Sequence, residues 1–278
     1  MKIATTLRRH PSVLIGAGIL ILIAVLTVLA PLIATHDPQE INPMMRLRGI
    51  SSANWLGTDS LGRDVWSRAV YGGRISLIVG LVVALFATTI GLLVGLISGF
   101  NRFADAILMR AMDGLMAIPA ILLAVALMAL SKASVMTVIF AITVVEVPRV
   151  ARLVRSVVLS IREQAYVEAA TVVGSRFWRM LWRHVVPNTL APLTVQATYI
   201  CAAAILIESL LSFLGAGTPP AVPSWGNIMA EGRIYFQISP LLILTPGLFL
   251  ATTVLAVNLM GDGLRDMLDP AIARRMTT

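Results

Sequence analysis

The residues with the most distinctive types and spacing lie in the stretch YVEAATVVGSRFWRMLWRHVVPN, residues 166–188. Within a helical pattern, the acid Glu168 directly precedes two alanines, Ala169 and Ala170. Two adjacent small side chains leave a flat helical surface that another protein can approach closely, and the acid adds a charge beside it. The chemistry expected of these residues is therefore binding, and we predict a docking surface.

A glycine divides this stretch into two predicted short helices. Tyr166, Ala170 and Val173 repeat at helical spacing, and Gly174 follows them in the position where a helix often ends with a positive φ. The second helix, which Pro187 is expected to stop, carries arginines and tryptophans on its faces: Arg176, Arg179, Arg183, Trp178 and Trp182. An alternative function for this half is an interfacial helix whose arginines meet lipid phosphates.

The sequence contains no cluster that predicts catalysis. The three histidines, His10, His36 and His184, lie far apart, so neither a metal site nor a catalytic triad is expected. The phosphate-binding pattern G-x-x-x-x-G-K-[ST] is absent from the chain. We therefore expect a protein that is not an enzyme and binds no cofactor, and whose energy comes from a partner.

The composition predicts a membrane protein. Of the 278 residues, 58% are hydrophobic and 13% are charged, against roughly 45–50% and 25% in soluble domains. The net charge is +8, but only Lys2 and Lys132 are lysines, and the arginines lie between apolar runs. Nucleic-acid binding is therefore not expected. The single cysteine, Cys201, excludes an internal disulfide.

Six apolar runs are long enough, or nearly so, to cross a bilayer, which takes about 20 residues. The fourth is the shortest and reaches adequate length only if Glu146, Pro148 and Arg149 lie at its end. The first is expected to be an uncleaved helix, because its apolar region exceeds the roughly 7–15 residues of a secretion signal. The predicted spans are residues 11–35, 75–101, 114–131, 133–145, 185–207 and 234–261.

The cations predict the orientation of these spans. Most of the 22 lysines and arginines fall on one side of the six-span arrangement, and an excess of cations marks the cytoplasmic side. Both termini and residues 166–188 are therefore predicted to be cytoplasmic. Residues 36–74 become an external loop in which Asp59 or Ser60 caps a short helix and Asp64 pairs with Arg68. That helix either lies on the outer leaflet or contacts a substrate-delivering protein.

Ionisable groups within apolar spans are costly and often functional. Glu208 either lines a translocation pathway or forms an ion pair with Arg74 or Arg233, two alternatives that the sequence leaves open. Glu146 is expected to pair with Arg149, one helical turn away.

Two further features of the spans concern helix contacts. Asn258 in the sixth span is expected to form an interhelical hydrogen bond or to lie in the pathway, and the pattern G-x-x-x-G at Gly91 and Gly95 favours close helix contact. A rival function, ion-coupled secondary transport or a channel, is expected to place acidic residues near the membrane midplane. Only Glu146 and Glu208 are available for that role, and both lie off-centre.

The spacing Glu168-Ala169-Ala170, three residues, Gly174, nine residues and a hydrophobic-Pro ending resembles the EAA loop of ABC importer permeases. The ending His184-Val185-Val186-Pro187 is similar to the dipeptide, oligopeptide and nickel branch of that family. Four more stretches resemble the second permease subunit of the branch: GTDSLGRDVWSRAVYGGRISL, ESLLSFLGAGTPP, PSWGN and GDGLRDMLDP.

This resemblance implies an all-α polytopic fold of the type I importer permease class, in the bacterial cytoplasmic membrane. It implies a permease domain over residues 74–263 with the coupling loop at about 163–190, preceded by residues 1–73 and followed by a tail, 264–278. It implies that Tyr166, Glu168, Ala169, Ala170, Gly174 and Pro187 contact an ATPase. The implied partners are a second homologous permease, two cytoplasmic ATPases that use ATP and Mg²⁺, an extracytoplasmic substrate-binding protein and membrane lipid. The implied cargo is a peptide-like solute, within a branch that also handles glutathione, nickel chelates and antimicrobial peptides.

Overall fold

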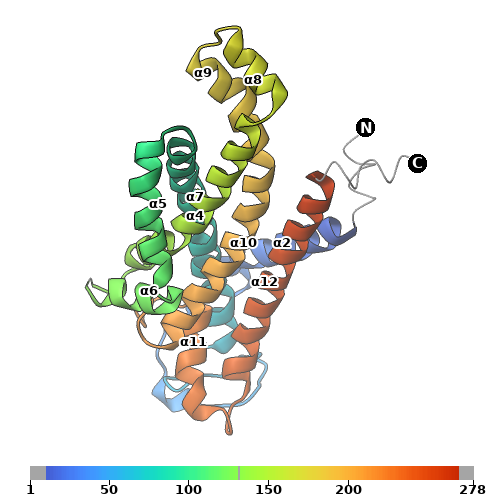
Figure 1. Cartoon of the computed structure of the whole chain (residues 1–278). Helices are drawn as coiled ribbons and strands as arrows, with labels where there is room; N and C mark the ends of the chain where they lie inside the picture. The colour runs from blue at the N-terminus through green and yellow to red at the C-terminus, as the bar shows by residue number, and fades with distance from the viewer. Residues whose placement is uncertain (1–10, 131, 269–278) are drawn as a thin grey trace.

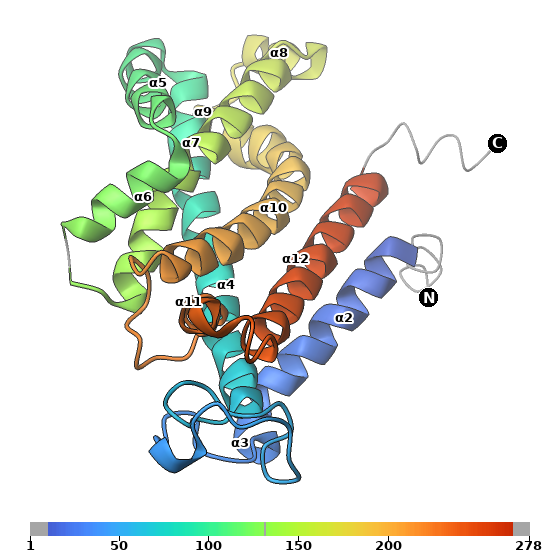
Figure 2. The same cartoon turned by 90° about the horizontal axis from the view of Figure 1, so that it is seen from below.

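The computed structural model describes residues 11–130 and 132–268, and within these ranges it contains helices and no strand. Figures 1 and 2 show two perpendicular views. The elements are α2 (Pro11–Val28), α3 (Ala30–Ile33), the 3₁₀ turn η1 (Pro43–Met45), α4 (Val65–Phe100), α5 (Arg102–Ala117), α6 (Ala120–Ala129), α7 (Val135–Arg162), α8 (Ala165–Val172), α9 (Phe177–Met180), the π-helical turn η2 (Leu181–Val185), α10 (Val186–Phe213), α11 (Trp225–Gly232), the 3₁₀ turn η3 (Arg233–Tyr235) and α12 (Leu241–Leu268).

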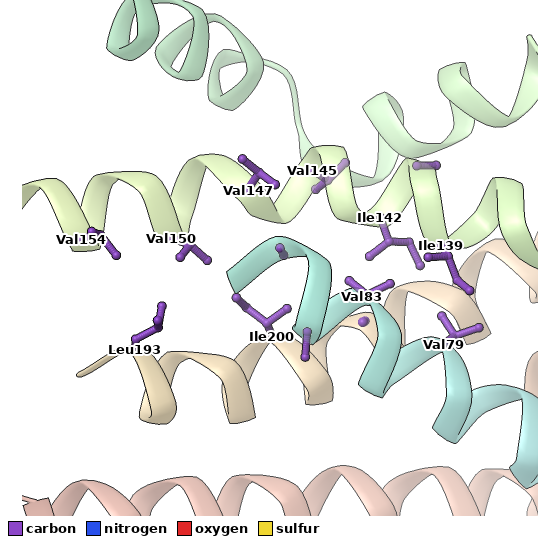
Figure 3. Packing of buried hydrophobic residues seen from close by; sticks show 14 of the residues in the cluster. Val79, Val83, Ile139, Ile142, Val145, Val147, Val150, Val154, Leu193 and Ile200 are labelled. Carbon is purple, nitrogen blue, oxygen red and sulfur yellow. The ribbon is translucent and has the colours of Figure 1, made fainter. Parts of the chain in front are cut away.

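The core lies where α4, α7 and α10 meet. Figure 3 shows their buried aliphatic side chains in contact, among them Val83 of α4, Ile142 of α7 and Ile200 of α10, each at most 1% exposed. α2 and α12 lie side by side next to this core in both views (Figures 1 and 2). α8 and α9 project from one end of the molecule, and the loop before α4 lies at the opposite end. The predicted all-α fold is thus confirmed for the described residues.

In the part of the chain that the structure describes, four helical stretches are long and apolar enough to cross a membrane: α2, α4, the continuous helix Trp178–Phe213 and α12. The pair α5–α6 makes a fifth candidate, but its two helices are bent by 92°. The prediction of one straight span over residues 114–131 is therefore wrong. Its cause is Pro119, which disfavours helical backbone in the residue before it, and Ile118 accordingly has ψ 131°.

The boundaries predicted for the fourth span are also wrong. Glu146, Pro148 and Arg149 do not end this helix but lie in the middle of α7, which is 28 residues long. The charges are tolerated because Arg149 Nη1 lies 3.1 Å from Glu146 Oε1, the ion pair that the sequence predicted. Half of the residues of α7 are buried, so much of its surface meets protein rather than lipid.

Two further boundaries differ from the prediction. α4 begins at Val65, so the external loop ends before it and residues 65–74 continue the span instead of forming a separate helix. The last span begins at Leu241 rather than at residue 234, and it continues to Leu268, beyond the predicted domain boundary at residue 263.

Close contact between α4 and α7 depends on glycines one helical turn apart. A Cβ atom added at Gly91, Gly95 or Gly99 would lie 2.4–2.6 Å from Val150, Val154 or Val158, respectively. Each valine therefore fills the space that a side chain on α4 would occupy. The G-x-x-x-G contact predicted from the sequence is confirmed and extends by one further turn, and it holds the two helices together along their C-terminal halves.

Replacing Gly95 with alanine is expected to destabilise the protein by about 1–3 kcal/mol, the usual cost of overpacking a core. The new methyl group would lie 2.7 Å from the carbonyl oxygen of Ala151, a backbone atom that cannot move aside alone. Gly114 of α5 is the control, because no atom lies within 4 Å of an added Cβ there. The melting temperature of the purified protein in detergent measures both variants. Equal stability of the two would contradict the close contact.

Candidate functional site: residues 165–188 and the polar clusters at the opposite end

α8 ends at Gly174 as the sequence predicted. Gly174 has φ +82°, the left-handed conformation that favours glycine. The Ser175 N–H donates to the Ala170 carbonyl at 3.0 Å, and the Val173 N–H donates to that of Ala169 at 3.1 Å. The first of these bonds is the six-to-one bond of a Schellman motif, which closes the helix. The chain therefore turns sharply between two short helices.

One face of α8 packs against the core, and the opposite face is exposed. Val167 is 2% exposed and belongs to the core cluster, together with Leu181 and Val185 of the following turn. Glu168 and Ala169 are exposed and Ala170 is half-buried. The flat alanine surface with an acid beside it is therefore available to a partner.

Two aromatic rings connect the two halves of the segment. The ring of Tyr166, which is 46% exposed, lies 5.6 Å from that of His184. The Tyr166 side chain is thus partly exposed beside the alanine surface. Its ring contact with His184 connects α8 to η2. The predicted docking residues on α8 are brought together in one surface.

Pro187 does not stop the helix, contrary to the prediction. It occupies the first turn of α10, and the helix is continuous from Trp178 to Phe213. The π-helical turn η2 just before Pro187 widens the helix at this point. The arginines and tryptophans of this half are exposed, as the interfacial alternative requires: Arg176, Arg179, Arg183, Trp178 and Trp182.

Glu208 is buried at the opposite end of α10, and hydroxyl groups surround it. Its carboxylate accepts from Ser76 Oγ of α4 at 3.0 Å and from Ser212 Oγ at 2.9 Å, and its side chain is 0% exposed. The predicted ion pair with Arg74 or Arg233 is wrong. Both arginines have other contacts, which the next paragraph describes, and buried carboxylates need donors rather than a particular charge.

The two outer arginines contact backbone and aromatic groups instead. Arg74 donates from Nε to the Thr27 carbonyl at 2.6 Å and from Nη2 to that of Val28 at 2.7 Å, which ties α4 to the end of α2. The guanidinium of Arg233 lies 5.7 Å from the ring centre of Phe213. Neither side chain therefore needs a carboxylate partner in the membrane.

The hydroxyl groups around Glu208 continue into the loop between α10 and α11. The Ser212 hydroxyl accepts from the Thr218 N–H at 3.2 Å, and Asn227 Nδ2 donates to Thr218 Oγ1 at 2.9 Å. Trp225 is fully buried, and its Nε1 donates to the Ala69 carbonyl of α4 at 2.9 Å. The stretches ESLLSFLGAGTPP and PSWGN thus form one buried polar network. Serines one turn from an acid in an apolar helix were the available sequence signal for it.

Asn258, the second pathway candidate, lies half-buried in α12. The structure does not bring it into the hydroxyl network of Glu208, whose partners come from α4 and α10.

Replacing Glu208 with alanine is expected to lower the amount of folded protein. Loss of hydrogen bonds to a charged group costs about 1.5–3 kcal/mol, and the cavity adds to that cost. Glu208→Gln keeps the volume and one acceptor oxygen, so its effect should be smaller. The measurement is the melting temperature together with uptake per assembled complex. Normal stability of Glu208→Gln with impaired uptake would instead favour a role in the pathway.

A second polar cluster lies in the loop before α4, which the sequence predicts to be external. Asp59 accepts from Arg63 Nε at 2.7 Å and from Arg68 Nη1 at 3.1 Å, and both arginines also contact Glu231 of α11. Asp59 is 2% and Arg68 1% exposed. These four residues, two acids and two arginines, are defined here as the external charge cluster. It joins the loop to α4 and α11.

The helix cap and the ion pair with Arg68 were predicted for the wrong acids in this loop. Asp64, not Asp59 or Ser60, caps the helix, because its carboxylate accepts from the Ser67 N–H at 2.8 Å. Arg68 pairs with Asp59 across a turn rather than with Asp64 on its own helix. No sequence pattern indicates the contact with Glu231, because Glu231 follows Asp59 by more than 170 positions along the chain.

Among the described residues, no group of three or more His, Cys, Asp or Glu side chains is placed to hold a metal ion. The open surface of residues 165–188 is the candidate functional site, and protein binding is the function predicted for it.

Comparison with known proteins places the chain in a family. Residues 87–274 match the model of the binding-protein-dependent transport system inner membrane component, and residues 2–49 match that of the N-terminal transmembrane domain of oligopeptide transport permease C. A probable peptide ABC transporter permease of Sinorhizobium fredii is 54% identical over 96% of this chain and 92% of its own length.

More distant relatives and a solved structure agree. A dipeptide transport system permease of Alkalihalophilus pseudofirmus is 40% identical over 95% of this chain and 87% of its own, and a glutathione transport system permease of Pectobacterium atrosepticum is 40% identical over 96% and 89%. A chain of the inward-facing MetNI methionine ABC transporter aligns in structure with this chain, with a TM-score of 0.62 at 20% identity. The alignment covers 73% of this chain and 96% of the MetNI chain, which shows a shared fold. This chain belongs to the binding-protein-dependent transport system inner membrane components, the permease subunits of ABC transporters.

Proposed function

We propose that this chain forms half of the membrane pathway of an ATP-driven importer of small peptides. The observation that carries the proposal is the open surface at Glu168 and Ala169 on α8, which the short turn at Gly174, with φ +82°, joins to the continuous helix Trp178–Phe213. A partner bound there can act on a membrane helix without an intervening flexible linker. Relatives named as peptide, dipeptide and glutathione permeases support a peptide cargo.

The partners follow from the same proposal. Two cytoplasmic ATPases bind the surface of residues 165–188 and supply the energy from ATP and Mg²⁺, so this chain itself is not an enzyme. A second, homologous permease completes the pathway as a heterodimer, and an extracytoplasmic binding protein delivers the solute. The family description, a binding-protein-dependent transport system, supports the last of these partners.

Uptake of labelled dipeptides, tripeptides and longer peptides tests the cargo. Cells lacking only this subunit are compared with cells that regain it from a plasmid. Restored uptake of one peptide class is the expected result. Unchanged uptake of every peptide, with loss of uptake of a nickel chelate, would overturn the peptide assignment while leaving the importer function intact.

We further propose six membrane crossings with both termini in the cytoplasm. α5–α6 and α7 supply the third and fourth crossings, and α7 is shielded from lipid because half of its residues are buried. Excess cations around residues 176 and 265 support the orientation.

Cysteine labelling tests this topology in a Cys201→Ser background. Arg176 and Ser52 are exposed, so cysteines placed there react readily with a membrane-impermeant reagent. Labelling of position 52 from outside intact cells, and of position 176 only after the membrane is opened, is expected. Labelling of both positions from the same side would contradict the proposed topology.

A further inference from the structure

A polar cavity of about 370 Å³ lies between the ends of α4, α5 and α7, on the side of the molecule from which α8 projects. Its wall includes Ser98 of α4, Arg102 of α5, and Arg162 and Glu163 at the end of α7. Glu163 is the first residue of the implied coupling loop, but none of these residues lies within residues 165–188, the surface proposed to bind the ATPase. The cavity therefore calls for its own explanation.

A buried hydroxyl group in this wall has no partner. Ser98 is 3% exposed, and its Oγ atom forms no hydrogen bond with any described residue. Buried polar atoms in folded proteins nearly always have a partner, so a lone hydroxyl beside a cavity indicates a ligand or water that contacts it.

The charged groups of the wall define what that ligand is. Arg162 is fixed by a hydrogen bond from Nη1 to the Gly99 carbonyl at 2.6 Å, which leaves other N–H groups of its guanidinium available. Asp105 is engaged by Arg155 through two hydrogen bonds, of 2.5 and 2.7 Å. The Arg162 guanidinium also lies 5.5 Å from the ring centre of Phe100. The charged groups of the wall without an oppositely charged partner among the described residues are thus two cations, Arg102 and Arg162, and one anion, Glu163.

The cavity lies at the level of the lipid headgroups. The uncharged run of residues 75–100 in α4 is about 39 Å long at 1.5 Å per residue, whereas the hydrocarbon core is about 30 Å thick. Its last residues, including Ser98, therefore extend beyond the acyl chains. Leu159 in the wall and the neighbouring Phe103 are 36% and 77% exposed and offer apolar surface to a lipid.

We propose that this cavity binds the headgroup of a phospholipid that carries both a phosphate and a primary ammonium group. The phosphate accepts from Arg102, Arg162 and the Ser98 hydroxyl, and the ammonium donates to Glu163. Such a headgroup matches the two cations and one anion of the wall, whereas a purely anionic headgroup leaves Glu163 unpaired. This lipid site is independent of the proposed cargo and of the ATPase surface.

Lipid retention by the purified importer complex tests the proposal. The delipidated complex is mixed in detergent with phosphatidylethanolamine, phosphatidylcholine or phosphatidylglycerol of the same acyl chains, and native mass spectrometry counts the bound lipids. Phosphatidylethanolamine should be retained about tenfold better than phosphatidylcholine, whose trimethylated group cannot donate a hydrogen bond, since one charge-assisted bond changes affinity by at least that factor.

Variants identify the cavity as the site of retention. Arg102→Gln and Ser98→Ala should each reduce retention of phosphatidylethanolamine, Arg102→Gln by about tenfold. Arg110→Gln is the matched control, because Arg110 is an exposed arginine two turns further along α5 and does not line the cavity. Ser98→Ala removes only one oxygen atom, so the folded complex remains available for the measurement.

Three results would overturn the proposal. Equal retention of the three lipids would show that the headgroup is not recognised. Equal competition by glycerophosphoethanolamine, which lacks acyl chains, would assign the cavity to a soluble phosphate compound. Loss of a protein subunit from the complex in Arg102→Gln, with lipid retention unchanged, would make the cavity a protein contact.

Discussion

Replacing Ala169 with tryptophan is expected to abolish peptide uptake while the protein still inserts in the membrane. Ala169 is exposed on α8, so the larger side chain meets no part of its own chain, but it occupies the surface that a partner must approach. A clash that costs about 3 kcal/mol weakens association more than 100-fold. Co-purification of the ATPase with this chain, together with substrate-stimulated ATP hydrolysis, measures the effect.

Gly174 provides a second test of the same surface. Valine at φ +82° is strained by about 1–2 kcal/mol or more, because a β-branched residue rarely adopts the left-handed conformation. No atom lies within 4 Å of an added Cβ, so the strain comes from the backbone alone. Gly174→Val should therefore misplace α8 and reduce coupling.

Matched controls separate these effects from general damage. Ala169→Ser keeps a small side chain, and Gly174→Asn supplies a residue that tolerates the left-handed conformation. Both should retain uptake. If Ala169→Trp and Gly174→Val also keep the ATPase and its stimulation at the level of the parent protein, residues 165–188 form only an interfacial helix pair.

Asp59→Asn is expected to destabilise the protein by about 3–5 kcal/mol, the usual cost of removing one partner from a buried ion pair. Arg68 is 1% exposed, and its Nε already has no hydrogen-bond partner among the described residues. Without the Asp59 carboxylate, Arg68 shares the single acid Glu231 with Arg63. A lower melting temperature and less folded protein in the membrane are the measurable results.

Asp113→Asn is the control for this prediction. Asp113 pairs with Arg152 at 2.7 Å, a shorter distance than that between Asp59 and Arg68, but the two side chains are 59% and 52% exposed. Exposed ion pairs contribute about 0–1 kcal/mol. A similar loss of stability in both variants would show that burial of the external charge cluster is not what makes Asp59 important.

The features that could be predicted from the sequence are those set by neighbouring residues. Gly174 ends α8 because a helix often closes with a glycine in the left-handed conformation, and that preference is local. Glu146 and Arg149 pair because they are three residues apart on one helix. The apolar runs likewise predicted most of the long helices, since their composition alone suits a bilayer.

The features that were missed depend on groups distant in the chain. Ser76 and Glu208 are 132 positions apart, and no periodicity connects them. The length of α7 was underestimated because the uncharged run ends at residue 145, whereas the fold supplies partners for the charges beyond it, as Asp105 does for Arg155. Pro187 was expected to end a helix, but the π-helical turn before it lets the helix continue.

The close contact between α4 and α7 has a mechanical consequence. α4 has 36 residues and is therefore about 54 Å long. Gly91, Gly95 and Gly99 leave no room for α4 to slide against α7, so the two helices tilt together as one lever. At that length, a tilt of about 5° displaces one end by about 5 Å relative to the other. A small tilt of α4 and α7 at the end nearest α8 thus produces a displacement of several ångströms at the external charge cluster.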